Sequence, residues 1–245
     1  MTRSLFLPSV VTLLISLFSS SLFADHLKLA VGLALPPYVI ADNDSGMELD
    51  IVREALRLSG HTSEPVYLPF GRVPKSVEEG ASDAALTVTE SSGLNNVHYS
   101  DSHITYQNVA VSLAVNKFPI NSVADLSSRS VIAFQDATKY LGGQFANMAS
   151  SNKRYSEKAK QSKQITMLFA ERVESVVMDI NIFKYFRAAE QKVKTDSDVT
   201  IHEIFEPSHY KVGFRRQQHR DDFNKGLKQL KESGQYEAIL KKYVN

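Results

Sequence analysis

The sequence of 245 residues contains no cysteine. This absence excludes a disulfide framework, a thiolate metal site, a cysteine nucleophile and the acylated cysteine of a lipoprotein anchor. A chain without disulfides is held together by its hydrophobic core. At this length the core can belong to one large domain or to two lobes of about 100 residues each.

An excess of charge of either sign is also absent. The 28 lysines and arginines nearly balance the 27 aspartates and glutamates, so the formal net charge is +1. A nearly neutral chain has no electrostatic reason to bind nucleic acid or anionic lipid. Residues 152–163 are locally basic, but Tyr155 is their only aromatic residue, so we interpret them as a solvated face or surface strand.

The common sequence templates of catalysis are missing too. There is no Gly-x-Ser-x-Gly elbow, no His-Glu-x-x-His pair and no glycine-rich phosphate loop. The seven histidines are scattered. We expect His98 and His103, the closest pair, at the surface or in internal hydrogen bonds and not in a metal site. The sequence therefore predicts no metal, no cofactor and no enzymatic activity.

A long hydrophobic run occurs only at the N-terminus. Arg3 is followed by a mainly apolar run over residues 5–18, and the small or polar residues 19–24 lead to Asp25. This order is typical of a secretory signal peptide cleaved after Ala24. An uncleaved membrane anchor is the alternative, but a spanning helix needs about 20 apolar residues. We therefore expect residues 1–24 to be removed from an exported, soluble protein.

The remaining chain alternates predicted strands and helices. Strands are expected at residues 27–33, 65–68 and 84–88, and helices at residues 47–58 and 73–79. The pattern then restarts, with strands at 109–115, 131–134, 199–205 and 210–214, a helix and a short strand within 170–177, and helices at 138–148, 182–193 and 221–243, the last broken near Gly234. Such alternation is typical of parallel sheets covered by helices, and its repetition predicts two α/β lobes.

Five residues lie at or near the ends of predicted strands, where open parallel sheets bind ligands. They are Tyr38, Phe70, Thr87, Thr89 and Asp179. Each has a structural explanation of its own, because aromatic residues often belong to the core, threonines often fill strands, and Asp179 could cap a helix. Their occurrence at equivalent places in the fold favours a binding site.

Seven segments carry a family resemblance, in family-like order and spacing. They are 35–38 (LPPY), 46–56 (GMELDIVREAL), 68–86 (LPFGRVPKSVEEGASDAAL), 98–102 (HYSDS), 120–134 (INSVADLSSRSVIAF), 173–185 (VESVVMDINIFKY), and 210–214 (YKVGF) with the final helix. No segment is specific alone, but together they cover nearly all of residues 25–245. The chain thus resembles the bacterial extracellular solute-binding proteins of family 3, the periplasmic amino-acid-binding proteins of ABC transporters.

The resemblance implies an α/β, two-lobed periplasmic binding protein fold of type II, in which each lobe has a mostly parallel sheet flanked by helices. Lobe one is expected to comprise residues 25–104 and 209–245, and lobe two residues 105–208. Two hinge strands, near residues 103–107 and 206–210, would join the lobes around a ligand cleft. A monomeric, periplasmic protein is implied.

The resemblance also implies how a ligand is held. Aromatic residues at the positions of Tyr38 and Phe70 would sandwich the ligand, and Asp179 would bind its ammonium group. Backbone groups and hydroxyls near Thr87 to Thr89 and near Thr138 would hydrogen-bond its carboxylate.

One departure from the family pattern concerns that carboxylate. Relatives that bind amino acids usually carry an arginine shortly after the threonine strand, whereas residues 86–98 contain no arginine or lysine. Arg72 is a possible replacement, or else a solvated residue at the start of a helix. An Arg72 that faces the cleft favours an amino acid or short peptide, and one that does not favours a polyamine or another amine without a carboxylate.

We therefore expect a protein that captures a small amine-bearing ligand, an amino acid or a related polar solute, and delivers it to an inner-membrane ABC permease. Two alternatives remain open. One is a sensory receptor with the same fold. The other is an enzyme resembling cyclohexadienyl dehydratases, with Glu48, Glu90 or Asp179 as its acid or base.

Overall fold

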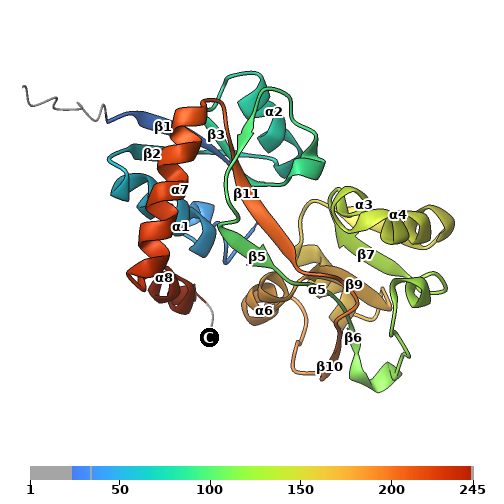
Figure 1. The fold of residues 1–245 in the computed structure, drawn as a ribbon. Helices are drawn as coiled ribbons and strands as arrows, with labels where there is room; N and C mark the ends of the chain where they lie inside the picture. The colour runs from blue at the N-terminus through green and yellow to red at the C-terminus, as the bar shows by residue number, and fades with distance from the viewer. Residues whose placement is uncertain (1–23, 34, 244–245) are drawn as a thin grey trace, which may run out of the picture.

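The computed structural model describes residues 24–33 and 35–243, and its strands form two sheets (Figure 1). The first sheet has the order β2 (Thr62–Leu68), β1 (His26–Gly32), β3 (Ala84–Val88), β11 (Ser208–Phe214) and β4 (His98–Tyr99), and β5 (Ile104–Tyr106) also pairs with β11. The second sheet has the order β10 (Val199–His202), β6 (Asn108–Leu113), β9 (Ser175–Asp179), β7 (Val131–Phe134) and β8 (Tyr155–Lys158). Both sheets are mixed, because β11 and β6 run antiparallel to their neighbours.

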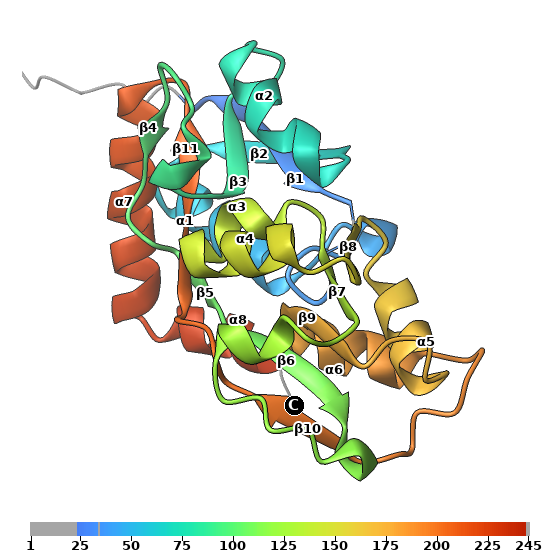
Figure 2. The same ribbon diagram turned by 90° about the vertical axis from the view of Figure 1, so that its right-hand side faces the viewer.

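Helices flank both sheets. Those beside the first sheet are α1 (Met47–Leu58), α2 (Val73–Glu78), α7 (Gln217–Glu232) and α8 (Gln235–Tyr243). Those beside the second are α3 (Ala137–Tyr140), α4 (Gly142–Ser151), α5 (Ser162–Phe169) and α6 (Ile180–Ala189). In both views α3 and α4 lie between α2 and β7 (Figure 2). Within the described ranges, none of the helices has the length and apolar character that crossing a membrane requires.

Burial explains why these segments form these elements. Every residue of β3 and of β6 is buried, so both strands are mainly apolar and show no alternation of polar and apolar residues. In α1 the buried residues recur at helical spacing, from Met47 through Ile51 and Val52 to Ala55 and Leu56. This face packs on α7, where Gly226 lets the two helix backbones approach closely.

The two segments predicted as hinges lie side by side between the sheets. β5 pairs with the first residues of β11, Tyr106 opposite Ser208 and Ile104 opposite Tyr210. β5 leads into β6 of the second sheet, while β11 continues into the first sheet beside β3. The proposed lobe limits at residues 104, 105, 208 and 209 stay a prediction, and the predicted signal peptide lies outside the described residues except for Ala24.

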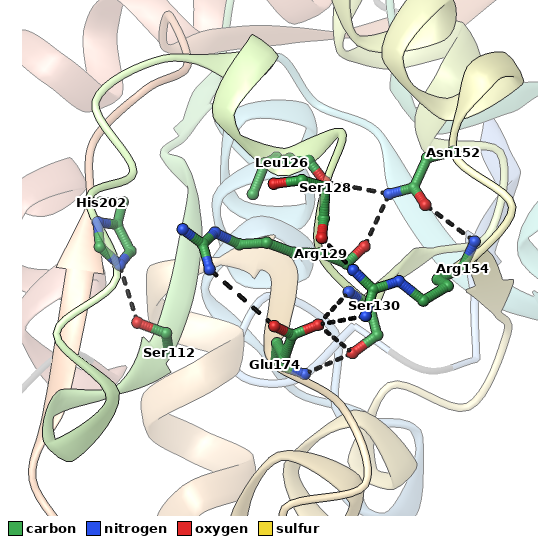
Figure 3. Close-up of polar contacts among 9 residues, drawn as sticks. All are labelled: Ser112, Leu126, Ser128, Arg129, Ser130, Asn152, Arg154, Glu174 and His202. Atoms are coloured by element: carbon green, nitrogen blue, oxygen red, sulfur yellow. Dashed lines mark hydrogen bonds and ion pairs between the residues drawn. The ribbon is translucent and has the colours of Figure 1, made fainter.

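A polar cluster connects the N-terminal ends of β7, β8 and β9 (Figure 3). The carboxylate of Glu174 accepts hydrogen bonds from the backbone N–H of Ser130, over 2.7 Å, and from Arg154, over 3.1 Å. The side chain of Asn152 donates to the carbonyls of Leu126 and Arg129. These contacts join the loops that precede the three strands, so the cluster has a structural role at the strands' N-terminal ends.

Several predicted elements differ from the structure. The strand expected at residues 199–205 ends at His202, and the helix expected at residues 182–193 begins at Ile180 and ends at Ala189. The helix expected at residues 138–148 is two helices, because Gly142 has a φ of 82°. The helix expected from residue 170 is wrong: α5 ends at Phe169, and Glu171 has a left-handed φ of 56°. The strand expected at residues 109–115 ends at Leu113, where a short 3-10 helix, Ala114–Asn116, begins.

Candidate functional site

A cavity of about 340 Å³ lies between the two sheets. The first sheet and its loops contribute Leu33, Leu35, Pro69, Phe70, Thr87, Tyr106 and Tyr210 to its wall, and the second contributes Asn108, Phe134, Gln135, Ala159, Lys160, Gln161, Asp179 and Ile182. About half of these side chains are apolar, and polar groups stand among them. This combination and this volume are typical of sites for small molecules.

Asp179 places a buried carboxylate in the cavity wall. It ends β9 and caps α6, and its Oδ1 accepts the N–H groups of Asn181 and Ile182 over 2.8 and 3.1 Å. Its Oδ2 accepts the hydroxyl of Tyr38 over 3.0 Å and the N–H of Gln107 over 2.9 Å. The side chain is 2% exposed, and burial raises its pKa to about 6. In the described part of the chain, no lysine, arginine or histidine forms an ion pair with it.

The two predicted aromatic residues occupy different places. Phe70 belongs to the cavity wall and packs near Tyr140, with 5.8 Å between ring centroids. Tyr38 is 1% exposed and is not a wall residue. Its ring stacks on that of Tyr106 at a centroid distance of 3.6 Å, and its hydroxyl reaches Asp179. Tyr106, and not Tyr38, therefore presents an aromatic ring to the cavity on this side.

Thr87 and Thr89 also differ. Thr87 is buried in the wall, has a left-handed φ of 57°, and donates its hydroxyl to the carboxylate of Glu48. A β-branched residue in this conformation is strained, and strained backbone conformations of this kind are concentrated at binding and active sites. Thr89 lies outside the wall, and its hydroxyl is bonded to Ser91 at the start of a short 3-10 helix.

A second buried carboxylate, Glu48, lies behind the wall. It is fully buried. Its carboxylate forms hydrogen bonds with Nε2 of His103 over 3.0 Å and with the hydroxyl of Tyr106 over 2.7 Å. Through the hydroxyls of Thr87 and Tyr106, Glu48 is thus hydrogen-bonded to two wall residues. Glu48 is not a wall residue, and Glu90, the other carboxylate considered for catalysis, pairs with Lys211 at the surface.

Of the groups expected to bind a ligand carboxylate, Thr87 belongs to the wall, whereas Thr89, Arg72 and Thr138 lie outside it. Arg72 is exposed at the end of the 3-10 helix Phe70–Arg72 and is not a wall residue. The N–H and hydroxyl of Thr138 both donate to Glu157. Of the seven residues that the sequence nominates, Phe70, Thr87 and Asp179 thus meet at the cavity, and Tyr38 stands directly behind Asp179.

Sequence reasoning missed several polar wall residues. Asn108 is the register partner of Asp179 in the second sheet, and its Nδ2 is buried without a hydrogen-bond partner in the described residues. Gln161, just before α5, likewise has a buried Oε1 without a partner there. Tyr106 lies within the predicted first hinge, residues 103–107, and Asn108 directly follows it, and this position was the one signal that could have drawn attention to them.

Within residues 24–33 and 35–243, no three histidine or acidic side chains are arranged to hold a metal ion. His103, which the sequence placed at the surface or in internal hydrogen bonds, is fully buried against Glu48.

Solved structures share this arrangement of two sheets. An ancestral arginine-binding protein bound to arginine is 20% identical, with a TM-score of 0.73 over 90% of this chain and 98% of that one. A histidine kinase sensor domain similar to periplasmic binding proteins is 16% identical, with a TM-score of 0.74 over 90% and 96%. The arginine-, lysine- and histidine-binding protein of Geobacillus stearothermophilus is 14% identical, with a TM-score of 0.72 over 89% and 94%. Identities this low show the fold alone, and they confirm the predicted type II periplasmic binding protein fold.

Sequence comparison adds the family. No curated protein matches the sequence significantly. Residues 27–245, however, match the model of the bacterial extracellular solute-binding proteins, family 3. Because this match extends over nearly all of the described chain, the protein belongs to family 3 of the bacterial extracellular solute-binding proteins.

Proposed function

We propose that this protein is a periplasmic solute-binding protein that holds a small amine-bearing ligand in the cavity between its sheets, and that it catalyses no reaction. The observation that carries the proposal is the carboxylate of Asp179, which is 2% exposed, lines the cavity and has no ion-pair partner in the described residues. A buried carboxylate without a cation is unfavourable, and its raised pKa reflects this.

A ligand ammonium group would supply the missing positive charge. The rings of Phe70, Tyr106 and Tyr210 line the same cavity and offer faces to a cation or to the methylene groups beside it. Closure of two lobes, residues 25–104 with 209–245 against residues 105–208, about the paired β5 and β11 segments would enclose the ligand. Cleavage of residues 1–24 would release the protein into the periplasm.

The partner that we propose is an inner-membrane ABC permease, which accepts the ligand from the closed form. A second candidate is a sensory receptor, and the similarity to a histidine kinase sensor domain supports it. The two functions share one cavity and differ only in the membrane protein that recognises the closed form. Crosslinking of the exported protein in native membranes, followed by identification of the partner, separates them.

Calorimetry on the purified protein tests the ligand-binding proposal. Wild type is expected to bind at least one small amine, and Asp179→Asn to weaken that binding at least about a hundredfold, because breaking a buried ion pair costs about 3–5 kcal/mol. Asp179→Ser preserves a residue able to cap α6 and separates loss of charge from loss of the helix cap. Asp196→Asn, at an exposed site, is the matched control. Equal affinity in wild type and both Asp179 variants would overturn the proposal.

A further inference from the structure

The loop after β7 binds a carboxylate that belongs to the protein itself. Asp136 has a left-handed φ of 62°, and its N–H donates to Oε2 of Glu157 over 2.7 Å. The N–H and the hydroxyl of Thr138 donate to Oε1 over 3.2 and 3.3 Å, and the hydroxyl of Tyr155 donates to the same oxygen over 2.8 Å. Four donors thus converge on one carboxylate, which is the arrangement that proteins use to bind an anion.

This loop borders the cavity. Phe134 and Gln135, directly before Asp136, belong to the cavity wall, and so do residues 159–161, which follow the strand that carries Glu157. A ligand carboxylate at this end of the cavity would find the donors of the loop already bonded. It would also meet the negative charge of Glu157 close behind them.

Positive charge at the cavity is confined to its exposed margin. Lys160 is the one lysine or arginine among the described wall residues, and it is exposed. Arg72 is exposed and outside the wall, and Lys139 pairs with Asp136 over 2.7 Å at the surface. A ligand carboxylate would therefore lack a buried cationic partner, whereas an ammonium group has Asp179.

We infer that the ligand of this cavity is an amine without a carboxylate. The inference rests on the proposed function and narrows it to a class of ligand. Glu157 takes up the anion-binding donors beside the cavity, and Asp179 is the buried charged group of the described wall that is left to bind a ligand. An alkyl amine or diamine has the required chemistry, an ammonium group for Asp179 and methylene groups for the apolar residues Phe70 and Ile182.

A matched ligand pair tests the inference directly. Among small probes, 1,4-diaminobutane and L-ornithine differ only by the carboxylate on the chain, so calorimetry with both isolates its effect. The diamine is expected to bind at least tenfold more tightly than the amino acid. Equal or tighter binding of L-ornithine would overturn this inference and leave the proposed function standing. Binding of neither probe, nor of any other amine or amino acid tested, would overturn both.

Removal of the internal carboxylate gives a test without a ligand. In Glu157→Ala the four donors lose their acceptor, so the melting temperature should fall, and added acetate should raise it again. Sodium chloride of equal ionic strength should not, and acetate should not stabilise wild type or Glu203→Ala, an exposed control. The preference for the diamine over L-ornithine should also narrow at least fivefold in Glu157→Ala.

A milder variant keeps the test decisive if Glu157→Ala does not fold. Glu157→Gln retains one acceptor oxygen but loses the negative charge, and the preference for the diamine should narrow in the same direction by a smaller factor. An unchanged preference in a folded Glu157 variant, or absence of any acetate effect on Glu157→Ala, would contradict the role assigned to this side chain.

Discussion

The hydroxyl of Tyr38 donates a hydrogen bond of 3.0 Å to Oδ2 of Asp179, although 141 residues separate the two in the sequence. Tyr38 lies in the segment between β1 of the first sheet and α1, and Asp179 ends β9 of the second sheet, so this bond connects the two halves of the molecule at the cavity. Asn181 in turn donates its side-chain amide to the Tyr38 hydroxyl. We therefore propose Tyr38 as a positioning residue that holds the carboxylate of Asp179.

Ligand affinity should depend on pH through Asp179. Burial raises the pKa of this carboxyl to about 6 in the free protein, while an alkyl amine stays protonated up to about pH 10. Binding of the cation requires the ionised carboxylate, so affinity should be nearly constant above about pH 7 and fall about tenfold between pH 7 and 5. Calorimetry across pH 5–8 checks this. A flat profile over that range would mean that Asp179 does not carry the binding.

The hydroxyl of Tyr106 should contribute measurably to stability. It donates to the fully buried Glu48 over 2.7 Å, so Tyr106→Phe leaves a buried carboxylate with one donor fewer. The free energy of unfolding should fall by about 1–3 kcal/mol, measured by urea denaturation. In the control Tyr67→Phe, a hydroxyl bonded to Asp44 at the surface is lost, and the change should stay below about 0.5 kcal/mol. A similar decrease in the free energy of unfolding in both variants would show that the buried hydrogen bond to Glu48 stabilises the protein no more than the surface hydrogen bond to Asp44.

Two glycines on helices should respond in opposite directions to alanine. A Cβ at Gly226 would lie 1.9 Å from the carbonyl oxygen of Ala55, so α7 and α1 would have to separate. Gly226→Ala should destabilise by about 1–3 kcal/mol or more. At Gly143, in α4, a Cβ meets nothing within 4 Å, and Gly143→Ala should stabilise by about 0.5–1 kcal/mol. Thermal unfolding distinguishes the two, and a mild effect at Gly226 would contradict the close helix packing.

Local patterns were sufficient for much of the fold. The bounds of α1, β3 and β7 agree with the sequence-based prediction residue for residue, because periodic or continuous apolar runs end at glycine or polar residues. The start of α5 was missed because residues 152–163 are polar and basic. Gln161 and Gln164 are buried at positions where a helix pattern is normally recognised by apolar residues. Tertiary burial, which a local pattern does not contain, decides that helix.

The site was less accessible to sequence reasoning. Strand ends pointed to Phe70, Thr87 and Asp179, and all three belong to the cavity wall. The N–H and hydroxyl of Thr138 donate to Glu157, 19 residues away on β8, the strand next to β7. The local sequence gives no indication of this pairing. Asn108 was missed for the same reason, because a single carboxamide has no sequence signature until its strand register places it beside Asp179.

Removal of the Tyr38 hydroxyl should move the pH dependence of binding. A hydrogen bond to the ionised form lowers the pKa of a carboxyl group, so Tyr38→Phe should raise the pKa of Asp179 above its value of about 6. The pH at which amine affinity begins to fall should then rise by about one to two units, since such a bond to a charged group contributes about 1.5–3 kcal/mol. Affinity at pH 8 should change much less than affinity at pH 6. Tyr185→Phe, at an exposed tyrosine, should leave the profile unchanged, and a uniform loss at every pH in Tyr38→Phe would instead indicate a direct contact with the ligand.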